Sequence, residues 1–180
     1  MRIGIDIDNT ITNTSSYIKE MLEKNNLSEL GTDLDNYTKE ELFKYDKLIR
    51  NNIEDIMANA PLNKDSKEVI ERLYKKHEIY IITARNNFFS DNLYKITLDY
   101  LNNRGILFHE LLFGYEEKRE ICIEKKIDIM LDDNIIINES LTNTKVRNVL
   151  FSTEHNKSYK GEKVSNWLEF EKIVTDHKEV

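Results

Sequence analysis

Two aspartates near the start of the chain, Asp6 and Asp8, are the first residues whose types and spacing could do chemistry. They lie at the end of an apolar run that begins at Ile3. Along an extended strand, side chains two positions apart point to the same face, so this spacing brings both carboxylates to one place. Thr10 can join them where the chain leaves the strand. Two carboxylates about 4 Å apart repel by roughly 4 kcal/mol at an effective dielectric near 20. We therefore expect a bound cation or a retained proton to compensate.

The ends of two other apolar runs carry further reactive groups. In open α/β sheets, ligands bind at the carboxyl ends of the strands, so groups at these ends are expected to meet. Four acids, one hydroxyl and one ammonium would converge there, which suits a hard cation such as Mg²⁺. Beside the first two acids, the sequence places Thr83, Ala84, Arg85, Lys118, Asp132 and Asp133.

The apolar runs themselves are nearly continuous rather than alternating. This pattern is typical of strands that are buried on both faces, as in a parallel sheet covered by helices. Segments with helical periodicity lie between the runs, and the alternation of strand and helix predicts a doubly wound, Rossmann-like α/β fold. The expected strands are 3–7, 79–83, 111–113, 127–131 and 146–151.

Residues 13–60 interrupt this alternation because they contain no run with the character of a strand. Thr38 and Glu41 have the spacing of a capping box at the start of a helix. We predict a small helical cap, inserted after the first strand into an α/β core formed by residues 1–12 and 61–180. Its expected helices are 16–24, 39–49 and 52–59.

Composition and charge limit the class of protein. The chain has 180 residues, which suits one domain with a small insertion, and its formal net charge is −7. An acidic surface repels a phosphate backbone, which argues against a dedicated nucleic-acid-binding module. No apolar run reaches the length of a membrane span. The pattern indicates no particular oligomeric state.

The single cysteine, Cys122, excludes an internal disulfide and favours a reducing compartment. The first residues read MRIGIDID, which is a strand pattern with acidic residues rather than the apolar segment of a signal peptide. A cytoplasmic protein is therefore expected.

The reactive residues resemble the four motifs of the haloacid dehalogenase superfamily of phosphohydrolases. The DIDNT segment, the strand that ends at Thr83, Lys118 and the LDD segment at 131–133 occur in the order of these motifs over most of the chain. Residues 61–85 and 118–134 are similar, more narrowly, to the 5′(3′)-deoxyribonucleotidase-like branch and its bacterial members. The insertion at 13–60 falls where that branch carries its small cap.

The resemblance implies a Mg²⁺-dependent phosphatase that works through an aspartyl-phosphate intermediate. Asp6 would be the nucleophile, and Asp8 would protonate the leaving alkoxide and then activate water. Mg²⁺ would be held by Asp6, by the backbone carbonyl of Asp8 and by the pair Asp132 and Asp133, with Asp133 favoured as the direct ligand.

The remaining candidates concern the substrate. The resemblance implies that Thr83 and the backbone amide of Ala84 hold phosphate oxygens, and that Lys118 offsets negative charge. Arg85 either contacts the substrate or forms a surface ion pair. Tyr17 either stacks on a base or belongs to the small core of the cap.

The expected substrate is a small phosphomonoester, above all a (deoxy)nucleoside monophosphate. Two alternatives stay open at this point. The protein could be a phosphatase for sugar phosphates or for nucleic-acid 3′-phosphates, or it could bind a phosphate ligand without turnover.

Overall fold

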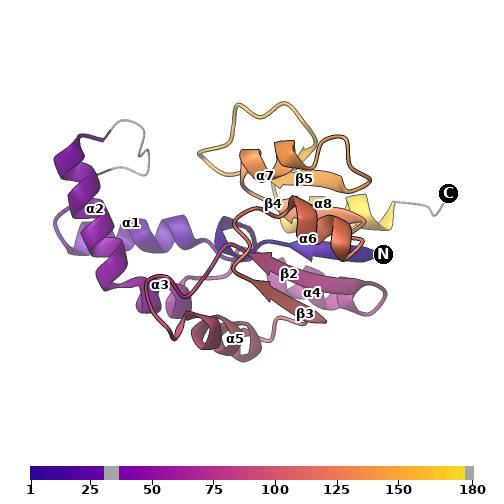
Figure 1. The fold of residues 1–180 in the computed structure, drawn as a ribbon, viewed down its shortest axis with the longest axis horizontal. Coiled ribbons are helices and arrows are strands. Elements are labelled where there is room, and N and C mark those ends of the chain that lie inside the picture. The colour runs from indigo at the N-terminus through magenta and orange to yellow at the C-terminus, as the bar shows by residue number, and fades with distance from the viewer. Residues whose placement is uncertain (31–36, 177–180) are drawn as a thin grey trace.

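The computed structural model of the protein describes residues 1–30 and 37–176. Residues 31–36 of the expected cap and residues 177–180 of the expected core lie outside the described residues. The described residues form a six-stranded sheet with the order β3-β2-β1-β4-β5-β6, in which every neighbouring pair is parallel (Figure 1). This confirms the predicted doubly wound α/β fold. The strands are β1 (Arg2–Ile5), β2 (Glu78–Thr83), β3 (Glu110–Phe113), β4 (Ile129–Asp132), β5 (Arg147–Phe151) and β6 (Lys163–Val164).

The strands agree with the expected ranges, apart from their ends and one addition. β1 ends at Ile5 rather than at residue 7, because a short helical turn, η1 (Ile7–Ile11), follows almost at once. β4 begins at Ile129 rather than at residue 127. The edge strand β6 is only two residues long, so it leaves too short a pattern in the sequence to be predicted.

Helices cover both faces of the sheet, and the strands supply a separate apolar cluster to each face. One cluster joins α4, α5 and α8 to alternate residues of β1, β2 and β4 such as Ile5, Ile81 and Leu131. The other joins α6 and α7 to the intervening residues, among them Ile82 and Met130. Burial on both faces explains why the strands read as continuous apolar runs. The helices around the sheet are α4 (Ser66–Tyr74), α5 (Leu93–Arg104), α6 (Arg119–Glu124), α7 (Ile135–Ser140) and α8 (Trp167–Thr175).

Among the described residues, three further helices lie between η1 and α4, and they extend to one side of the sheet (Figure 1). The second begins with the predicted capping box, in which the Thr38 and Glu41 side chains bind each other's backbone amides. The third packs against α5, where the Tyr100 hydroxyl donates to the Ala60 carbonyl over 2.6 Å. The described residues of this segment thus form helices close to the expected ranges. Its helices are α1 (Thr14–Lys24), α2 (Lys39–Asn51) and α3 (Ile53–Asn59).

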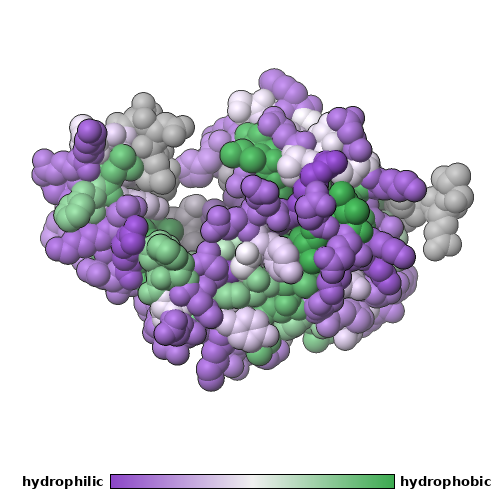
Figure 2. Space-filling view, in the orientation of Figure 1, coloured by the Kyte–Doolittle hydropathy of each residue, from purple (hydrophilic) through white to green (hydrophobic). Residues whose placement is uncertain are grey.

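The visible face of the molecule is largely hydrophilic, with small and separate hydrophobic areas (Figure 2). The exposed apolar side chains include Phe43 on α2, Phe88 after β2 and Ile136 on α7. Among the described residues, no helix combines the length and the apolar composition needed to cross a bilayer.

Gly4 lies on the central strand β1, next to buried side chains of the neighbouring strands β2 and β4. A Cβ atom at this position would lie 2.6 Å from Sδ of Met130 and 3.2 Å from Cδ1 of Ile82. Both neighbours are fully buried. Gly4→Ala should therefore lower the free energy of unfolding by about 1–3 kcal/mol, measured by denaturant unfolding.

A second substitution separates overpacking from other effects of the alanine. Met130→Val shortens the neighbouring side chain, so the double variant should lose less stability than the two single losses added together. Full additivity, or a Gly4→Ala variant as stable as the wild type, would contradict the overpacking explanation.

Candidate active site

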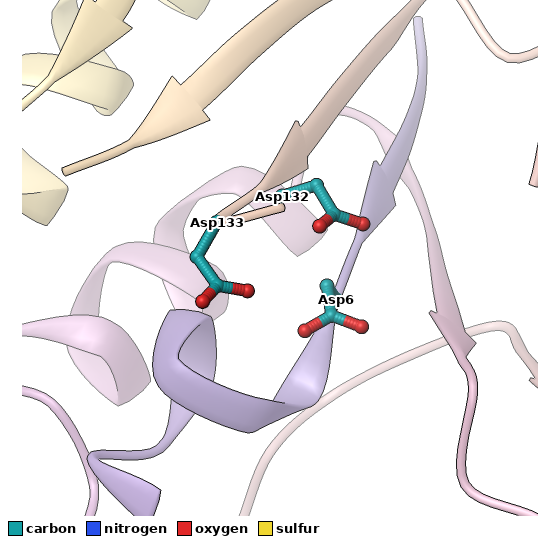
Figure 3. A group of neighbouring side chains, drawn as sticks. All are labelled: Asp6, Asp132 and Asp133. Atoms are coloured by element: carbon teal, nitrogen blue, oxygen red, sulfur yellow. The ribbon is translucent and has the colours of Figure 1, made fainter. Parts of the chain in front are cut away.

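The carboxyl ends of β1, β2 and β4 meet at one edge of the sheet. Asp6 follows β1 directly, and its amide donates to the Leu131 carbonyl of β4 over 3.0 Å, so it is fixed beside Asp132. Figure 3 shows the carboxylates of Asp6, Asp132 and Asp133 turned toward one another. One oxygen from each of these three lies within 4.8 Å of the other two. Such a set of oxygen donors fits a hard divalent cation.

The ammonium of Lys118 lies on the inner side of this cluster. It donates to Asp6 Oδ1 and, over 2.7 Å, to Asp132 Oδ2, and the Lys118 side chain is only 3% exposed. Lys118 is the residue directly before α6, in agreement with its predicted position at the start of that helix. Three carboxylates face one ammonium, so negative charge remains in excess at a buried position.

Burial and crowding act directly on the protonation of the acids. Burial raises the pKa of Asp6 to about 7; the charges of Asp132 and Asp8 add to this, and Lys118 opposes it. Burial, with Asp6 and Asp132 nearby, raises the pKa of Asp133 to about 8. Burial alone would lower the pKa of Lys118, but Asp6 and Asp132 raise it, so the ammonium stays charged. Near neutral pH the cluster therefore holds protons that a bound cation can displace.

The carboxylate of Asp8 lies apart from the three clustered acids. Asp8 is within η1 but has extended backbone angles, and the next residue, Asn9, has a left-handed φ of 59°. The side chain of Asp8 accepts hydrogen bonds from Arg85 and, over 2.6 Å, from the Thr14 hydroxyl. Burial would raise the pKa of Asp8, but these partners outweigh it and lower the pKa. The two acids of the first motif thus have opposite environments.

Arg85 corrects one of the expectations from the sequence. The Arg85 side chain is 1% exposed and pairs with Asp8 at the cleft, so the expected ion pair at the surface is wrong. The guanidinium also lies 3.4 Å from the Met57 carbonyl and 3.4 Å from the Thr97 hydroxyl. Residues from the inserted helices and from α5 surround this side chain, which is why it is shielded from solvent.

A cleft of about 520 Å³ opens over the clustered acids. It brings together most of the candidates that the sequence indicates. Thr83 and Ala84 lie on its wall with Lys118, so a hydroxyl, a backbone amide and an ammonium face the same space as the acids. The predicted residues that line the cleft are Asp6, Asp8, Thr83, Ala84, Lys118, Asp132 and Asp133.

Besides Arg85, two candidates do not line this cleft, Thr10 and Tyr17. Thr10 is 0% exposed, and its hydroxyl has no hydrogen-bond partner among the described residues. Its carbonyl accepts from the Trp167 indole over 3.1 Å and from the Asn63 side chain over 2.8 Å. The expectation that Thr10 joins the acids fails because the chain turns within η1, which ends the alternation of a strand.

Tyr17 lies on α1 and points to α3 rather than to the cleft. Its hydroxyl donates to Asp55 over 2.9 Å. This contact favours the second of its two expected roles, packing within the inserted helices, over stacking on a base.

Two buried asparagines that the sequence analysis missed fix the backbone of the acid pair Asp132 and Asp133. The Asn156 carboxamide donates to the carbonyls of Asp133 and Phe151, both over 2.8 Å. The Asn138 carboxamide donates to the Asp132 carbonyl over 3.1 Å. Asn138 follows the LDD motif closely enough to be suspected. Asn156 leaves no signal, because its contact with Asp133 spans 23 positions of the chain.

A second cavity of about 470 Å³ adjoins the cleft. It lies between α1 and the loop after β5, and its other lining residues include Ser16 and Lys19. Asn9, Thr153 and His155 line both spaces, so the two are adjacent at these residues. A substrate whose phosphate reached the acids would thus find further room beyond them.

Comparison with known proteins shows the family to which this chain belongs. The model of the family described as "5′ nucleotidase, deoxy (Pyrimidine), cytosolic type C protein" matches residues 1–180. The nucleotidase CA_C3379 of Clostridium acetobutylicum is 25% identical over 192 residues, which cover 97% of this chain and 93% of that protein. YqfW of Bacillus subtilis is 26% identical over 195 residues, which cover 99% of this chain and 95% of that protein.

Solved structures share the fold at lower sequence identity. The haloacid dehalogenase-like hydrolase SP0104 of Streptococcus pneumoniae aligns with a TM-score of 0.64 and 12% identity, over 98% of both chains. YfnB of Bacillus subtilis, solved with bound magnesium, aligns with a TM-score of 0.63 and 13% identity, over 96% of this chain and 97% of that chain.

The crowding of the acids predicts a stabilising substitution. Without divalent cations, Asp133→Asn removes one of three neighbouring carboxylates and keeps the side-chain shape. The variant should be more stable than the wild type by about 1 kcal/mol, or about 2–4 °C in Tm for a chain of this size. Calorimetry in EDTA at pH 7.5 measures this difference.

Magnesium should reverse the order of thermal stability of the wild type and Asp133→Asn. Added Mg²⁺ is expected to raise the Tm of the wild type and to leave Asp133→Asn nearly unchanged, because ligand binding to the folded state stabilises it. Asp91→Asn, an exposed carboxylate on the loop before α5, serves as the control and should behave as the wild type. An equal gain from Mg²⁺ in wild type and Asp133→Asn would contradict the assignment of Asp133 as a ligand.

Proposed function

Because the chain belongs to the family of cytosolic type C 5′ nucleotidases, and is thus a phosphomonoester hydrolase of the haloacid dehalogenase superfamily, we propose that it hydrolyses (deoxy)nucleoside monophosphates in the cytoplasm. One observation carries the proposal. Asp6, Lys118 and the pair Asp132 and Asp133 converge on one cleft at the carboxyl edge of the sheet.

The donor set supports Mg²⁺ as the cofactor. Asp6, Asp132 and Asp133 would hold it, together with the backbone carbonyl of Asp8. Bound there, it would neutralise negative charge on the phosphate oxygens as they approach the acids. YfnB, which shares the fold, binds magnesium in its crystal structure.

In the first step, a carboxylate oxygen of Asp6 attacks phosphorus, and the bond from phosphorus to the ester oxygen breaks. Because its pKa is lowered, Asp8 must first take up a proton from solvent in the cleft; it then gives this proton to the departing alkoxide, so the nucleoside leaves as a neutral alcohol. The Thr83 hydroxyl and the Ala84 amide donate to the phosphoryl oxygens, and Lys118 balances their charge. Asp6 then carries the phosphoryl group.

In the second step, water attacks the phosphorus of the aspartyl-phosphate. Asp8, now a carboxylate, accepts a proton from that water, and the bond between phosphorus and the Asp6 oxygen breaks. Inorganic phosphate leaves, and both acids return to their starting forms. The raised pKa of Asp6 requires that the cluster lose its protons before attack, which a bound cation promotes.

The inserted helices would serve as a cap over this chemistry. Residues 13–60 form the proposed cap, and residues 1–12 and 61–180 form the core. The cavity beside α1 offers hydrogen-bonding side chains such as Ser16 and His155 to a leaving group. A small phosphomonoester is the proposed partner, and the acidic balance of the chain disfavours nucleic acid.

A phosphate-release panel tests the proposed function. With Mg²⁺, deoxyribonucleoside and ribonucleoside monophosphates should release phosphate faster than sugar phosphates, and EDTA should abolish the release. Asp6→Asn should lower turnover by about a thousandfold or more, since it removes the attacking oxygen.

Three results would contradict parts of the proposal. Wild-type turnover in Asp6→Asn would refute the nucleophile, whereas a panel led by sugar phosphates would refute the substrate class. Nucleotide binding without phosphate release would indicate a binding module. Asp91→Asn is the matched control for loss of an acid and should retain activity.

A further inference from the structure

The buried side chain of Arg85 forms an ion pair with Asp8, and the proposed reaction gives Arg85 no role. Arg85 Nε lies 2.8 Å from Asp8 Oδ2, and Arg85 Nη2 lies 2.8 Å from Asp8 Oδ1. A planar guanidinium that binds both oxygens of a carboxylate fixes its orientation as well as its charge. The Arg85 side chain is 1% exposed, whereas that of Asp8 is 29% exposed and lines the cleft.

The hydrogen bonds of Asp8 are distributed unequally over its two oxygens. Oδ1 accepts from Arg85 Nη2 and from the Thr14 hydroxyl, so both of its lone-pair directions are used. Oδ2 accepts only from Arg85 Nε among the described residues. Oδ2 is therefore the oxygen with acceptor capacity left for a proton.

Arg85 is itself held by two helices. Its third nitrogen, Nη1, lies 3.4 Å from the Met57 carbonyl of α3 and 3.4 Å from the Thr97 hydroxyl of α5. The guanidinium carbon also lies 5.9 Å from the centre of the Tyr100 ring. The position of Asp8 thus depends on the packing of α3 against α5.

We propose that Arg85 is a positioning residue, which holds the Asp8 carboxylate so that Oδ2 exchanges the proton with the ester oxygen. The proposal rests on the proposed role of Asp8 as acid and base. It differs from a contact between Arg85 and substrate, because all three guanidinium nitrogens already have partners within the protein.

The dependence of rate on the leaving group distinguishes positioning from other roles. The alkoxide of a nucleotide is a poor leaving group that requires a well-placed acid, whereas p-nitrophenolate departs without a proton. A residue that orients Asp8 should therefore matter for the first kind of ester and hardly for the second.

The test compares the rates of hydrolysis of deoxyuridine 5′-monophosphate and p-nitrophenyl phosphate by the Arg85→Lys variant. Lysine keeps the positive charge but cannot form the bidentate hydrogen bonds to Asp8. The comparison uses kcat/KM, which reports the first step and not the hydrolysis of the aspartyl-phosphate that both esters share. The kcat/KM for the nucleotide should fall by about a hundredfold, the low end of what a general acid supplies, and that for the aryl ester by less than about threefold. Arg104→Lys is the matched control. Arg104 lies over the same Tyr100 ring at 5.2 Å but is exposed, so both rates should stay unchanged.

Two further variants keep the test decisive if Arg85→Lys folds poorly. Thr14→Val removes one bond to Oδ1 and should shift the ratio of the two rates in the same direction, by a smaller factor. In Arg85→Ala, added guanidinium chloride should restore the nucleotide rate more than the aryl rate.

If the Arg85 variants lost rate equally on both esters and guanidinium chloride did not selectively restore the nucleotide rate, the proposal would be overturned. Arg85 would then have only a structural role. A rise in KM for both esters with kcat unchanged would overturn it in favour of a phosphate contact. Failure of the proposed function has a different signature: Asp8→Asn would then affect both esters equally, or the wild type would show no Mg²⁺-dependent release.

Discussion

The ammonium of Lys118 lies between Asp6 and Asp132 and donates to both, and all three side chains are largely buried at the base of the cleft. Without this charge, the two buried carboxylates would have no cation in contact, and loss of one partner of such a pair typically costs about 3–5 kcal/mol. One ammonium, however, cannot neutralise three acids. The site is therefore stable enough to form but still short of positive charge, and that shortage is what makes it suited to a divalent cation and a phosphate ester.

The same constraint separates the two acids of the first motif. Asp6 shares Lys118 with other carboxylates, and its pKa is raised to about 7, whereas Asp8 has a guanidinium to itself and its pKa is lowered. In sites where one acid attacks and the other donates a proton, it is the proton donor whose pKa is usually raised. Here the two shifts run the other way. The proposed roles therefore require a bound cation to lower the pKa of Asp6 and require Asp8 to take up a proton before the ester bond breaks.

The positions of the acids and of Arg85 depend on residues and elements that have no proposed role in the reaction. The parallel sheet brings the ends of β1 and β4 together, and buried carboxamides of Asn138 and Asn156 then hold the carbonyls of the acid pair. On the other side, α3 and α5 enclose Arg85. Helices that belong to the insertion therefore contribute to the environment of Asp8 in the core.

The sequence by itself determined all strands of the sheet except β6, most helix limits and most of the residues that line the cleft at the carboxyl edge. It could do so because apolar periodicity, the capping box at Thr38 and the order of the motifs are local signals. Only the tertiary structure decided that Arg85 binds Asp8, that Thr10 is buried and that Asn156 supports Asp133. Arg85 and Asp8 are 77 positions apart, and a contact of that span depends on how helices pack over the sheet, which no local pattern records.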